Sequence, residues 1–304
     1  MIHYVTGDLF DTPAQTLINT VNTVGVMGKG IALRFKKTFP AMFEEYRAIC
    51  ERQEFSIGSL HLYSTGHKLV VNFPTKKHWR SPSRPEWIRA GLATFVQNYD
   101  RMGIHSVAFP PLGCGNGELS FSDVVWPIMD EYLKGLPIPV YIYAPHPPIG
   151  PPEHREPQKT TEWLRSQPRD LAFSEVWQDI RRVLHRSSTF ETLARRAVYE
   201  AALEPMRDEV RIVTAGKTIT ISMDECYDFW IQLREYGYLA RGSLPAHRER
   251  DASYILPILA ELPYVQVVHS SPGYATFQSN PSLALQIVAA EMPVSDPSSQ
   301  LELI

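Results

Sequence analysis

The stretch that decides the fold is residues 18–32, which read Ile-Asn-Thr-Val-Asn-Thr-Val-Gly-Val-Met-Gly-Lys-Gly-Ile-Ala. An apolar strand over residues 16–21 ends at the polar Asn22, a turn with three glycines follows, and residues 31–37 predict a helix. α/β proteins hold phosphorylated ligands with this arrangement, because glycine lets the backbone approach a phosphate and helix N–H groups point at its charge. The stretch therefore predicts an α/β fold with a phosphate-binding turn.

The turn matches neither of the common phosphate-binding motifs. It lacks the Gly-Lys-Ser/Thr ending of a P-loop, because Lys29 lies between two glycines. Its Gly-x-x-Gly-x-Gly spacing also differs from the dinucleotide-binding fingerprint, and no acidic residue clearly takes the ribose position. Taken alone, the turn is equally consistent with a glycine turn that only packs a helix onto a strand.

A second glycine-rich loop favours the ligand-binding interpretation. Residues 106–109 predict a strand, residues 110–117 read Pro-Pro-Leu-Gly-Cys-Gly-Asn-Gly, and a helix is expected from residue 122. Ligands of open α/β sheets bind outside the carboxyl ends of the strands. Two such loops could hold a diphosphate from two sides, which makes two unrelated turns the weaker explanation.

Length and composition limit the class of protein. The 304 residues suffice for about two domains, and the net charge of -3 argues against binding nucleic acid by bulk charge. No apolar run is long enough for a membrane span, and the N-terminus resembles neither a signal nor a transit peptide. The three cysteines lack paired spacing and the histidines form no ligand pattern, so we expect a cytoplasmic protein with no metal site, no cofactor and no membrane partner.

The pattern of elements changes after a proline-rich stretch at residues 145–152. Before it, strands are expected at residues 2–5, 16–21, 59–63, 69–72, 106–109 and 140–144, and helices at 31–37, 41–53, 85–102 and 122–133. This alternation predicts a three-layer α/β/α domain with a mixed sheet over residues 1–147. Residues 148–158 are expected to form a stiff linker, because prolines suit neither helices nor inner strands.

Residues 159–304 predict a smaller α+β domain with a winged-helix-like order. Helices are expected at residues 160–165, 172–185, 188–203, 223–235 and 252–261, with strand pairs at 209–213 and 217–221 and at 265–269 and 274–279. From residue 155 onward the chain has 16 Lys and Arg against 20 Asp and Glu, so this domain is acidic. An acidic domain is a poor reader of duplex DNA, which counts against a transcription regulator, and it suits a basic partner.

The first domain resembles a macrodomain, the family that binds ADP-ribose. The resemblance covers about residues 1–150 and rests on residues 7–8, 17–22, 25–32 and 110–115. Within the family, residues 24–32 and the run Asn-Phe-Pro-Thr-Lys-Lys-His-Trp-Arg at 72–80 are similar to the DarG-type antitoxins. These bacterial proteins remove ADP-ribose from thymine bases of single-stranded DNA, where a DarT-like toxin attaches it. The resemblance thus implies ADP-ribose, ADP-ribosylated single-stranded DNA and a cognate DarT-like toxin as partners.

The resemblance also implies the residues of an ADP-ribose site. Asp8 would bond the adenine amino group, Asn22 would lie by the distal ribose, and the two glycine loops would hold the diphosphate. The full expected set is Asp8, Leu9, Asn19, Asn22, Gly28, Lys29, Gly30, Ile31, Thr75, Pro111, Leu112, Gly113, Cys114, Gly115, Asn116 and Gly117. Cys114 lacks an adjacent base, so it is expected to fill space rather than act as a nucleophile.

Lys76 matches the catalytic lysine of the related ADP-ribosyl-glutamate hydrolases, which directly follows a threonine. Cleavage of an N-glycosidic bond needs a proton for the departing base, and a lysine can donate one or attack the anomeric carbon as a neutral amine. Lys77 is expected to lower the pKa of Lys76. The chain departs from those relatives where they have a second-loop aspartate, because it has Asn116-Gly117 followed by Glu118. The alternative for Lys76 and Lys77 is an ordinary pair of solvated cations.

Residues 77–80, Lys77, His78, Trp79 and Arg80, are candidates for contact with DNA. Cations next to an aromatic ring suit single-stranded nucleic acid, where the ring stacks on a base. Equally, Trp79 could pack at the edge of the core while the cations face water. The functional hypotheses are a DNA ADP-ribosyl glycohydrolase antitoxin and a non-catalytic ADP-ribose reader, and the second domain is expected either to bind the toxin or to form a dimer.

Overall fold

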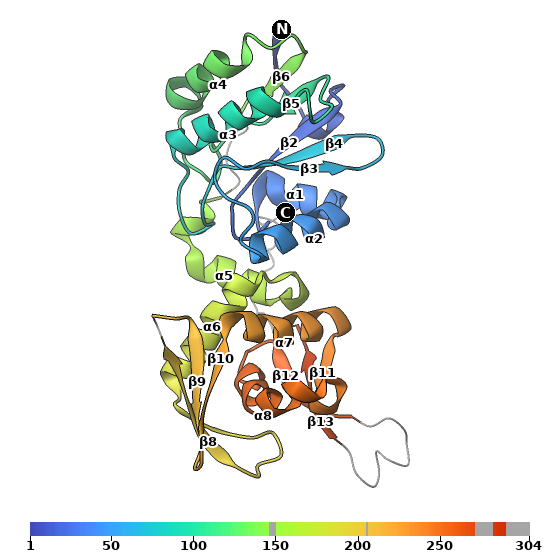
Figure 1. Cartoon of the computed structure of the whole chain (residues 1–304). Helices are drawn as coiled ribbons and strands as arrows, with labels where there is room; N and C mark the ends of the chain where they lie inside the picture. Colours follow the sequence, from blue (N-terminus) through green and yellow to red (C-terminus); the bar gives the residue numbers. More distant parts are fainter. Residues whose placement is uncertain (146–149, 205, 271–281, 290–304) are drawn as a thin grey trace. The chain divides into compact units, whose positions relative to one another are not determined.

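The computed structural model of the chain describes residues 1–145, 150–204, 206–270 and 282–289. The chain divides into two compact units, Met1–Thr161 and Glu162–Pro293. Each unit has its own sheets and its own buried core (Figure 1). Among the described helices, none has the length and apolar character that a membrane span requires.

The first unit is built on a six-stranded mixed sheet. Its strands are β1 (Ile2–Val5), β2 (Thr16–Val21), β3 (His61–Ser64), β4 (Leu69–Pro74), β5 (Val107–Phe109) and β6 (Val140–Tyr143). The order across the sheet is β1-β6-β5-β2-β4-β3, and all neighbours are parallel except β3 and β4. The predicted mixed sheet is thereby confirmed.

Helices cover both faces of this sheet, which makes three layers (Figure 1). The helices of the unit are α1 (Gly30–Thr38), α2 (Pro40–Glu51), α3 (Pro85–Asn98), α4 (Trp126–Leu133) and three short turns at Leu9–Asp11, Phe121–Val125 and Glu153–Arg155. Successive strand side chains point to opposite faces. Leu17 and Val21 of β2 therefore pack with Phe35 and Tyr46 from α1 and α2, whereas Ile18 packs with residues from α3 and α4.

The helix expected over residues 122–133 begins differently from its prediction. Its first turn, Phe121–Val125, is a π-helix that leads into α4 at Trp126. Pro127 follows within the first turn of α4, and proline has no N–H to continue the hydrogen bonds of a preceding α-helix. The N–H of Trp126, directly before the proline, donates to the carbonyl oxygen of Phe121, which closes the wider π-turn.

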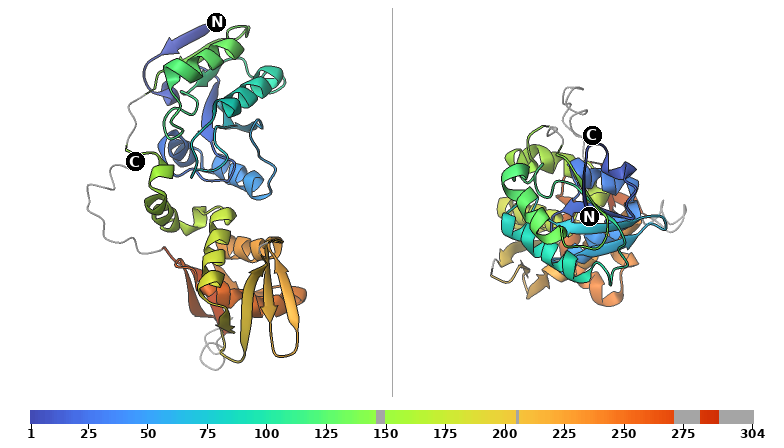
Figure 2. Two further views of the ribbon diagram at one scale, coloured as in Figure 1. Left: turned by 90° about the vertical axis from the view of Figure 1, so that its left-hand side faces the viewer. Right: turned by 90° about the horizontal axis from the view of Figure 1, so that it is seen from above.

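The second unit is α+β, as predicted, but contains two antiparallel sheets. The first has the order β10-β9-β8-β7 and the second has the order β11-β13-β12. Figure 2 shows β8, β9 and β10 side by side in yellow to orange. The strands are β7 (Thr189–Glu191), β8 (Val198–Glu204), β9 (Glu209–Val213), β10 (Thr218–Ser222), β11 (Tyr238–Ala240), β12 (Val265–Ser270) and β13 (Ser282–Ile287).

The helices of the second unit are α6 (Phe173–Arg186), α7 (Met223–Tyr236) and α8 (Ala246–Ala260), with short turns at Pro168–Asp170 and Arg241–Ser243. Helix α5 (Pro157–Arg165) begins in the first unit, which ends at Thr161. The order α7, β11, α8, β12, β13 places a strand between two helices and a strand pair after them. The winged-helix-like order stays a prediction. β12 pairs with β13. The strand expected at residues 274–279 lies outside the described residues.

The helix predicted over residues 188–203 is wrong, because this stretch forms β7 and most of β8. Glu, Ala and Leu in this stretch favour a helix by intrinsic propensity. In the structure Tyr199 and Ala201 alternate with exposed Val198 and Glu200, which is the period of a half-buried strand. Pairing with β9 and burial against the core outweigh the local preference.

Candidate functional site

Three loops meet where β2, β4 and β5 end. The three strands are neighbours and parallel, so their carboxyl ends lie at the same edge of the sheet. We call the segments that follow them the first loop (residues 22–30), the lysine loop (residues 75–84) and the second loop (residues 110–120). The backbone N–H groups of Thr75 and Lys76 both donate to the carbonyl oxygen of Val21, at 2.9 and 3.3 Å. This pairing holds the lysine loop against the start of the first loop.

The first and second loops also approach each other closely. A Cβ atom added to Gly30 would lie 3.1 Å from Nδ2 of Asn116, and Gly30 has a φ of +60°. A larger residue at position 30 would therefore push the loops apart and strain the backbone. The two glycine loops that the sequence predicts to grip one ligand are thus neighbours in the structure.

The side chain of Asn22 organises the first loop. Its Nδ2 donates to the carbonyl oxygen of Val26 at 2.6 Å, and its Oδ1 accepts from the N–H groups of Val24 and Val26 at 3.0 and 3.3 Å. Tyr46, a fully buried residue of α2, donates its hydroxyl to the backbone carbonyl of Asn22 at 2.7 Å. The resemblance implies Asn22 as a ribose contact, and the structure adds that the residue holds the turn in shape.

In the second loop, two glycines are required by close packing against Ser83 of the lysine loop. An added Cβ at Gly117 would lie 2.2 Å from the Ser83 Oγ, and one at Gly113 would lie 3.0 Å from the same atom. The Ser83 N–H donates to the carbonyl oxygen of Gly117 at 3.0 Å. By contrast, a Cβ at Gly115 would meet nothing within 4 Å, so this exposed position faces open space.

Lys76 is buried at the centre of the three loops. Its side chain is 7% exposed, and its Nζ forms no hydrogen bond within the described residues. Burial lowers the pKa of Lys76, and the charges of Glu153 and Glu118 offset part of that effect. The cause is therefore desolvation rather than the neighbouring Lys77. The alternative of a solvated cation is wrong for Lys76, because its ammonium group is shielded from water.

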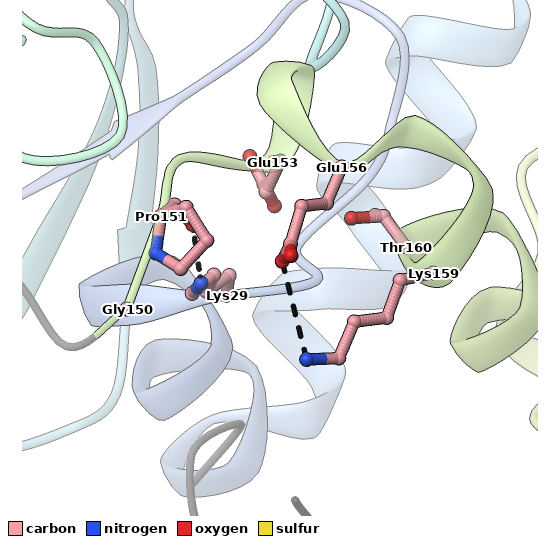
Figure 3. Close-up of a pocket in the computed structure, with 7 residues that line it drawn as sticks. All are labelled: Lys29, Gly150, Pro151, Glu153, Glu156, Lys159 and Thr160. Carbon is pink, nitrogen blue, oxygen red and sulfur yellow. Dashed lines mark hydrogen bonds and ion pairs between the residues drawn. The ribbon is translucent and has the colours of Figure 1, made fainter.

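A segment that follows β6 completes the surroundings of Lys76. We call residues 150–156 the η3 segment, after the short turn Glu153–Arg155. Lys29 Nζ donates to the carbonyl oxygen of Pro151 at 2.6 Å, and Glu153 Oε2 lies 3.8 Å from Lys76 Nζ. A small pocket next to this contact, drawn in Figure 3, is lined by Lys29, Gly150, Pro151, Glu153, Glu156, Lys159 and Thr160.

The η3 segment also contacts the second loop. Glu118 pairs with His154 at 2.7 Å and with Arg155 at 2.5 Å. The hydrogen bond from His154 is the main reason that the pKa of Glu118 is lowered. Residues 148–158 are predicted as a linker from their prolines, and that prediction contained no signal for Glu153 as a site residue. No short-range pattern could have found it, because its relation to Lys76 exists only in three dimensions.

The remaining expected ADP-ribose contacts differ in accessibility. Asp8 caps the turn Leu9–Asp11 through the Phe10 N–H and pairs with Arg34 at 2.6 Å, on the surface. Asn19 is fully buried and donates to Asn72 Oδ1 of the adjacent strand at 2.8 Å. Other buried members of the expected set are Leu9, Gly28, Thr75, Leu112, Gly113 and Gly117. Its partly exposed members include Ile31, Pro111, Cys114 and Asn116. Burial raises the pKa of Cys114 to about 12, which fits a filler and not a nucleophile.

Of the DNA-contact candidates, Trp79 is fully buried. The guanidinium of Arg80 lies 3.9 Å from the centre of the Trp79 ring. The ring therefore offers no free face to a base, and packing in the core is the correct alternative for Trp79. Lys77 is exposed, and His78 and Arg80 are partly exposed, so only these three have surface that a nucleic acid could contact.

Comparison with known proteins places the first unit in a family. Residues 18–126 match the Macro domain family. A DNA ADP-ribosyl glycohydrolase from Thermus aquaticus is 44% identical over 151 residues, which cover 48% of this chain and 41% of that protein. A DNA ADP-ribosyl transferase-DNA ADP-ribosyl glycohydrolase fusion protein from Thermosipho africanus is 42% identical over 160 residues, which cover 46% of this chain and 41% of that protein.

The solved macrodomain of Thermus aquaticus DarG is 43% identical and has a TM-score of 0.46, with 48% of this chain and 99% of that chain covered. The match to the two longer relatives covers 41% of each of them, so the chain spans less than half of their length. The N-terminal unit of this chain is a macrodomain related to those of the DarG-type DNA ADP-ribosyl glycohydrolases.

Proposed function

We propose that this chain is a DNA ADP-ribosyl glycohydrolase antitoxin. Its macrodomain would remove ADP-ribose from thymidine in single-stranded DNA by hydrolysis of the N-glycosidic bond. The observation that carries the proposal is the buried Lys76 between two glycine loops that touch at Gly30 and Asn116. Sequence identity of 44% to a DNA ADP-ribosyl glycohydrolase supports the same activity.

The geometry suits such a ligand. Backbone N–H groups of the two glycine loops and the N-terminus of α1, which begins at Gly30, supply partial positive charge for a diphosphate. The resemblance puts the distal ribose at Asn22, and the backbone N–H of Lys76 donates to the carbonyl oxygen of the preceding residue, Val21. A buried ammonium group can protonate a departing base without competition from water.

The second unit, we further propose, binds and blocks a cognate DarT-like toxin. Its side chains are acidic in sum, and an enzyme that acts on DNA needs a basic groove. The fusion of a DNA ADP-ribosyl transferase to a DNA ADP-ribosyl glycohydrolase in one relative supports a functional pair of this kind. A dimerisation role is the alternative for this unit.

A non-catalytic ADP-ribose reader is the second candidate function. The chain has Asn116 and Gly117 where the related hydrolases have an aspartate. A macrodomain without a competent acid and base would bind ADP-ribose and release nothing.

One assay separates the two functions. The purified full-length chain is incubated with an oligonucleotide that carries ADP-ribose on one thymidine, and free ADP-ribose and unmodified oligonucleotide are measured over time. We expect both products in equal amounts. Tight binding of ADP-ribose with no release from the oligonucleotide would favour the reader.

A further inference from the structure

The site contains a buried carboxylate that has no counterpart among the residues expected from the family resemblance. Glu153 Oε2 lies 3.8 Å from Lys76 Nζ, and the side chains are 9% and 7% exposed. Glu153 lies outside residues 18–126, the part of the chain that matches the Macro domain family. A buried charge is costly unless it is paired, and this juxtaposition offsets part of the desolvation of both groups.

Contacts from both glycine loops fix the position of this carboxylate. On one side, Lys29 of the first loop bonds the carbonyl oxygen of Pro151 at 2.6 Å. On the other side, Glu118 of the second loop holds His154 and Arg155. Residues on each side of Glu153 are therefore tied to the loops that are proposed to hold the diphosphate, through the Pro151 carbonyl and through the His154 and Arg155 side chains.

Glu118, which follows the position of the missing aspartate, is poorly suited to accept a proton. Both of its oxygens are engaged, one by His154 and the other by Arg155, and these contacts lower its pKa. Burial raises the pKa of Glu153, and the charges of Lys76 and Lys29 offset part of this rise. A carboxylate with a raised pKa is the stronger base of the two.

We infer that Glu153 is the general base of the reaction, which takes a proton from the attacking water while Lys76 protonates the departing thymine. This inference rests on the proposed glycohydrolase function. Glu153 would thus replace the second-loop aspartate from a different part of the chain. Catalysis would then depend on the η3 segment, which supplies the base. The acid, Lys76, and the base, Glu153, would both be buried side chains.

The step balances without any further reactant. The oxygen of water bonds to the anomeric carbon of the distal ribose as one of its protons passes to the Glu153 carboxylate. The bond from that carbon to the thymine nitrogen breaks, its electron pair stays with the base, and the Lys76 ammonium supplies the proton that neutralises it. Glu153 then returns its proton to the Lys76 amine across the 3.8 Å contact, which restores the starting state.

The test uses the full chain and an ADP-ribosylated thymidine oligonucleotide. Glu153→Gln keeps the size of the side chain and removes the base, so we expect the single-turnover rate to fall by about 10²–10⁴-fold, with free ADP-ribose affinity nearly unchanged. Glu162→Gln, at an exposed position on α5, is the control and should keep the wild-type rate. Glu153→Asp should recover part of the activity, because it restores a carboxylate.

The pH profile distinguishes a base from a structural residue. In the wild type the rate should rise with pH as Glu153 loses its proton, and this acid limb should be absent from the residual rate of Glu153→Gln. The charged groups that face the pair are Lys29 and Glu118. If the Gln variant fails to fold, the wild-type profile still decides, since a rate that does not fall toward acid pH overturns the inference.

Two other results would also overturn it. A Glu153→Gln rate equal to that of the wild type would remove Glu153 from the chemistry. A faster rate and tighter ADP-ribose binding in this variant would show that the η3 segment obstructs the site. Absence of product with the wild-type chain would instead reject the proposed function itself.

Discussion

Tyr46 of α2 donates its hydroxyl to the backbone carbonyl of Asn22 at 2.7 Å, at the point where β2 ends and the first loop begins. The same hydroxyl lies 3.1 Å from Asn22 Oδ1. A fully buried aromatic side chain thus joins the hydrophobic core to the residue that shapes the first loop.

Tyr46→Phe should therefore loosen the first loop and destabilise the macrodomain. Removal of one partner leaves a buried carbonyl group unpaired, which costs about 1–3 kcal/mol. A domain of this size loses roughly 2–4 °C in melting temperature per kcal/mol. Thermal unfolding and ADP-ribose titration check both effects, with the exposed Tyr236→Phe as the control. An unchanged melting temperature would mean that water replaces the hydroxyl.

Gly115→Glu should eliminate ADP-ribose binding without unfolding the protein. A Cβ atom at this position would meet no protein atom within 4 Å, so the substitution adds bulk and negative charge to the space proposed for the diphosphate. Gly135→Glu, at another exposed and open glycine, is the matched control. Isothermal titration measures the affinity of each variant. Wild-type affinity in a folded Gly115→Glu protein would show that the diphosphate lies elsewhere.

Lys76→Ala should abolish the release of ADP-ribose from DNA and leave the binding of free ADP-ribose nearly intact. The loops hold the diphosphate, whereas Lys76 acts only on the scissile bond, and loss of an acid typically costs about 10²–10⁴-fold in rate. Lys76→Met, which keeps the buried stem, separates loss of the charge from loss of packing. Lys134→Ala is the control, since that side chain is exposed and belongs to none of the three loops. Full activity in both Lys76 variants would exclude this residue from the mechanism.

The rate should also decline at alkaline pH earlier than an ordinary lysine would require. Lys76 must carry its proton to act as an acid, and burial lowers its pKa, with Glu153 and Glu118 opposing the shift. As pH rises through this lowered pKa, the protonated fraction and the rate fall together. The pH profile of single-turnover ADP-ribose release measures this alkaline decline in rate. A rate that rises with pH over the same range would indicate that the neutral amine attacks the anomeric carbon.

Inhibition of the toxin should survive the loss of catalysis and weaken with salt. The full-length Lys76→Met variant is mixed with a cognate DarT-like toxin, and ADP-ribosylation of single-stranded DNA is followed at low and high ionic strength. Because the second unit is acidic, screening should weaken its attraction to a basic groove. Light scattering of the chain alone tests dimerisation in parallel. A stable dimer that leaves the toxin fully active would reject the proposed role of the second unit.

Local pattern was sufficient for most elements of the macrodomain. The strands Ile2–Val5 and Thr16–Val21 begin and end at the predicted residues, because their apolar runs are bounded by polar residues and turns. The prediction failed at β8, where helix-forming residues lie in a strand whose alternate side chains are buried. Local propensity and tertiary pairing disagree there, and pairing prevails.

The sequence by itself determined the α/β architecture, the two glycine loops and the candidacy of Lys76, since each depends on residue order over a few positions. Only the tertiary structure decided that Trp79 is buried, that Lys76 is shielded from water and that Glu153 lies 3.8 Å from its ammonium group. These relations depend on which surfaces come together when β2, β4 and β5 align and the η3 segment packs against them. Burial and charge pairing between distant residues arise from packing in three dimensions, which no short-range pattern encodes.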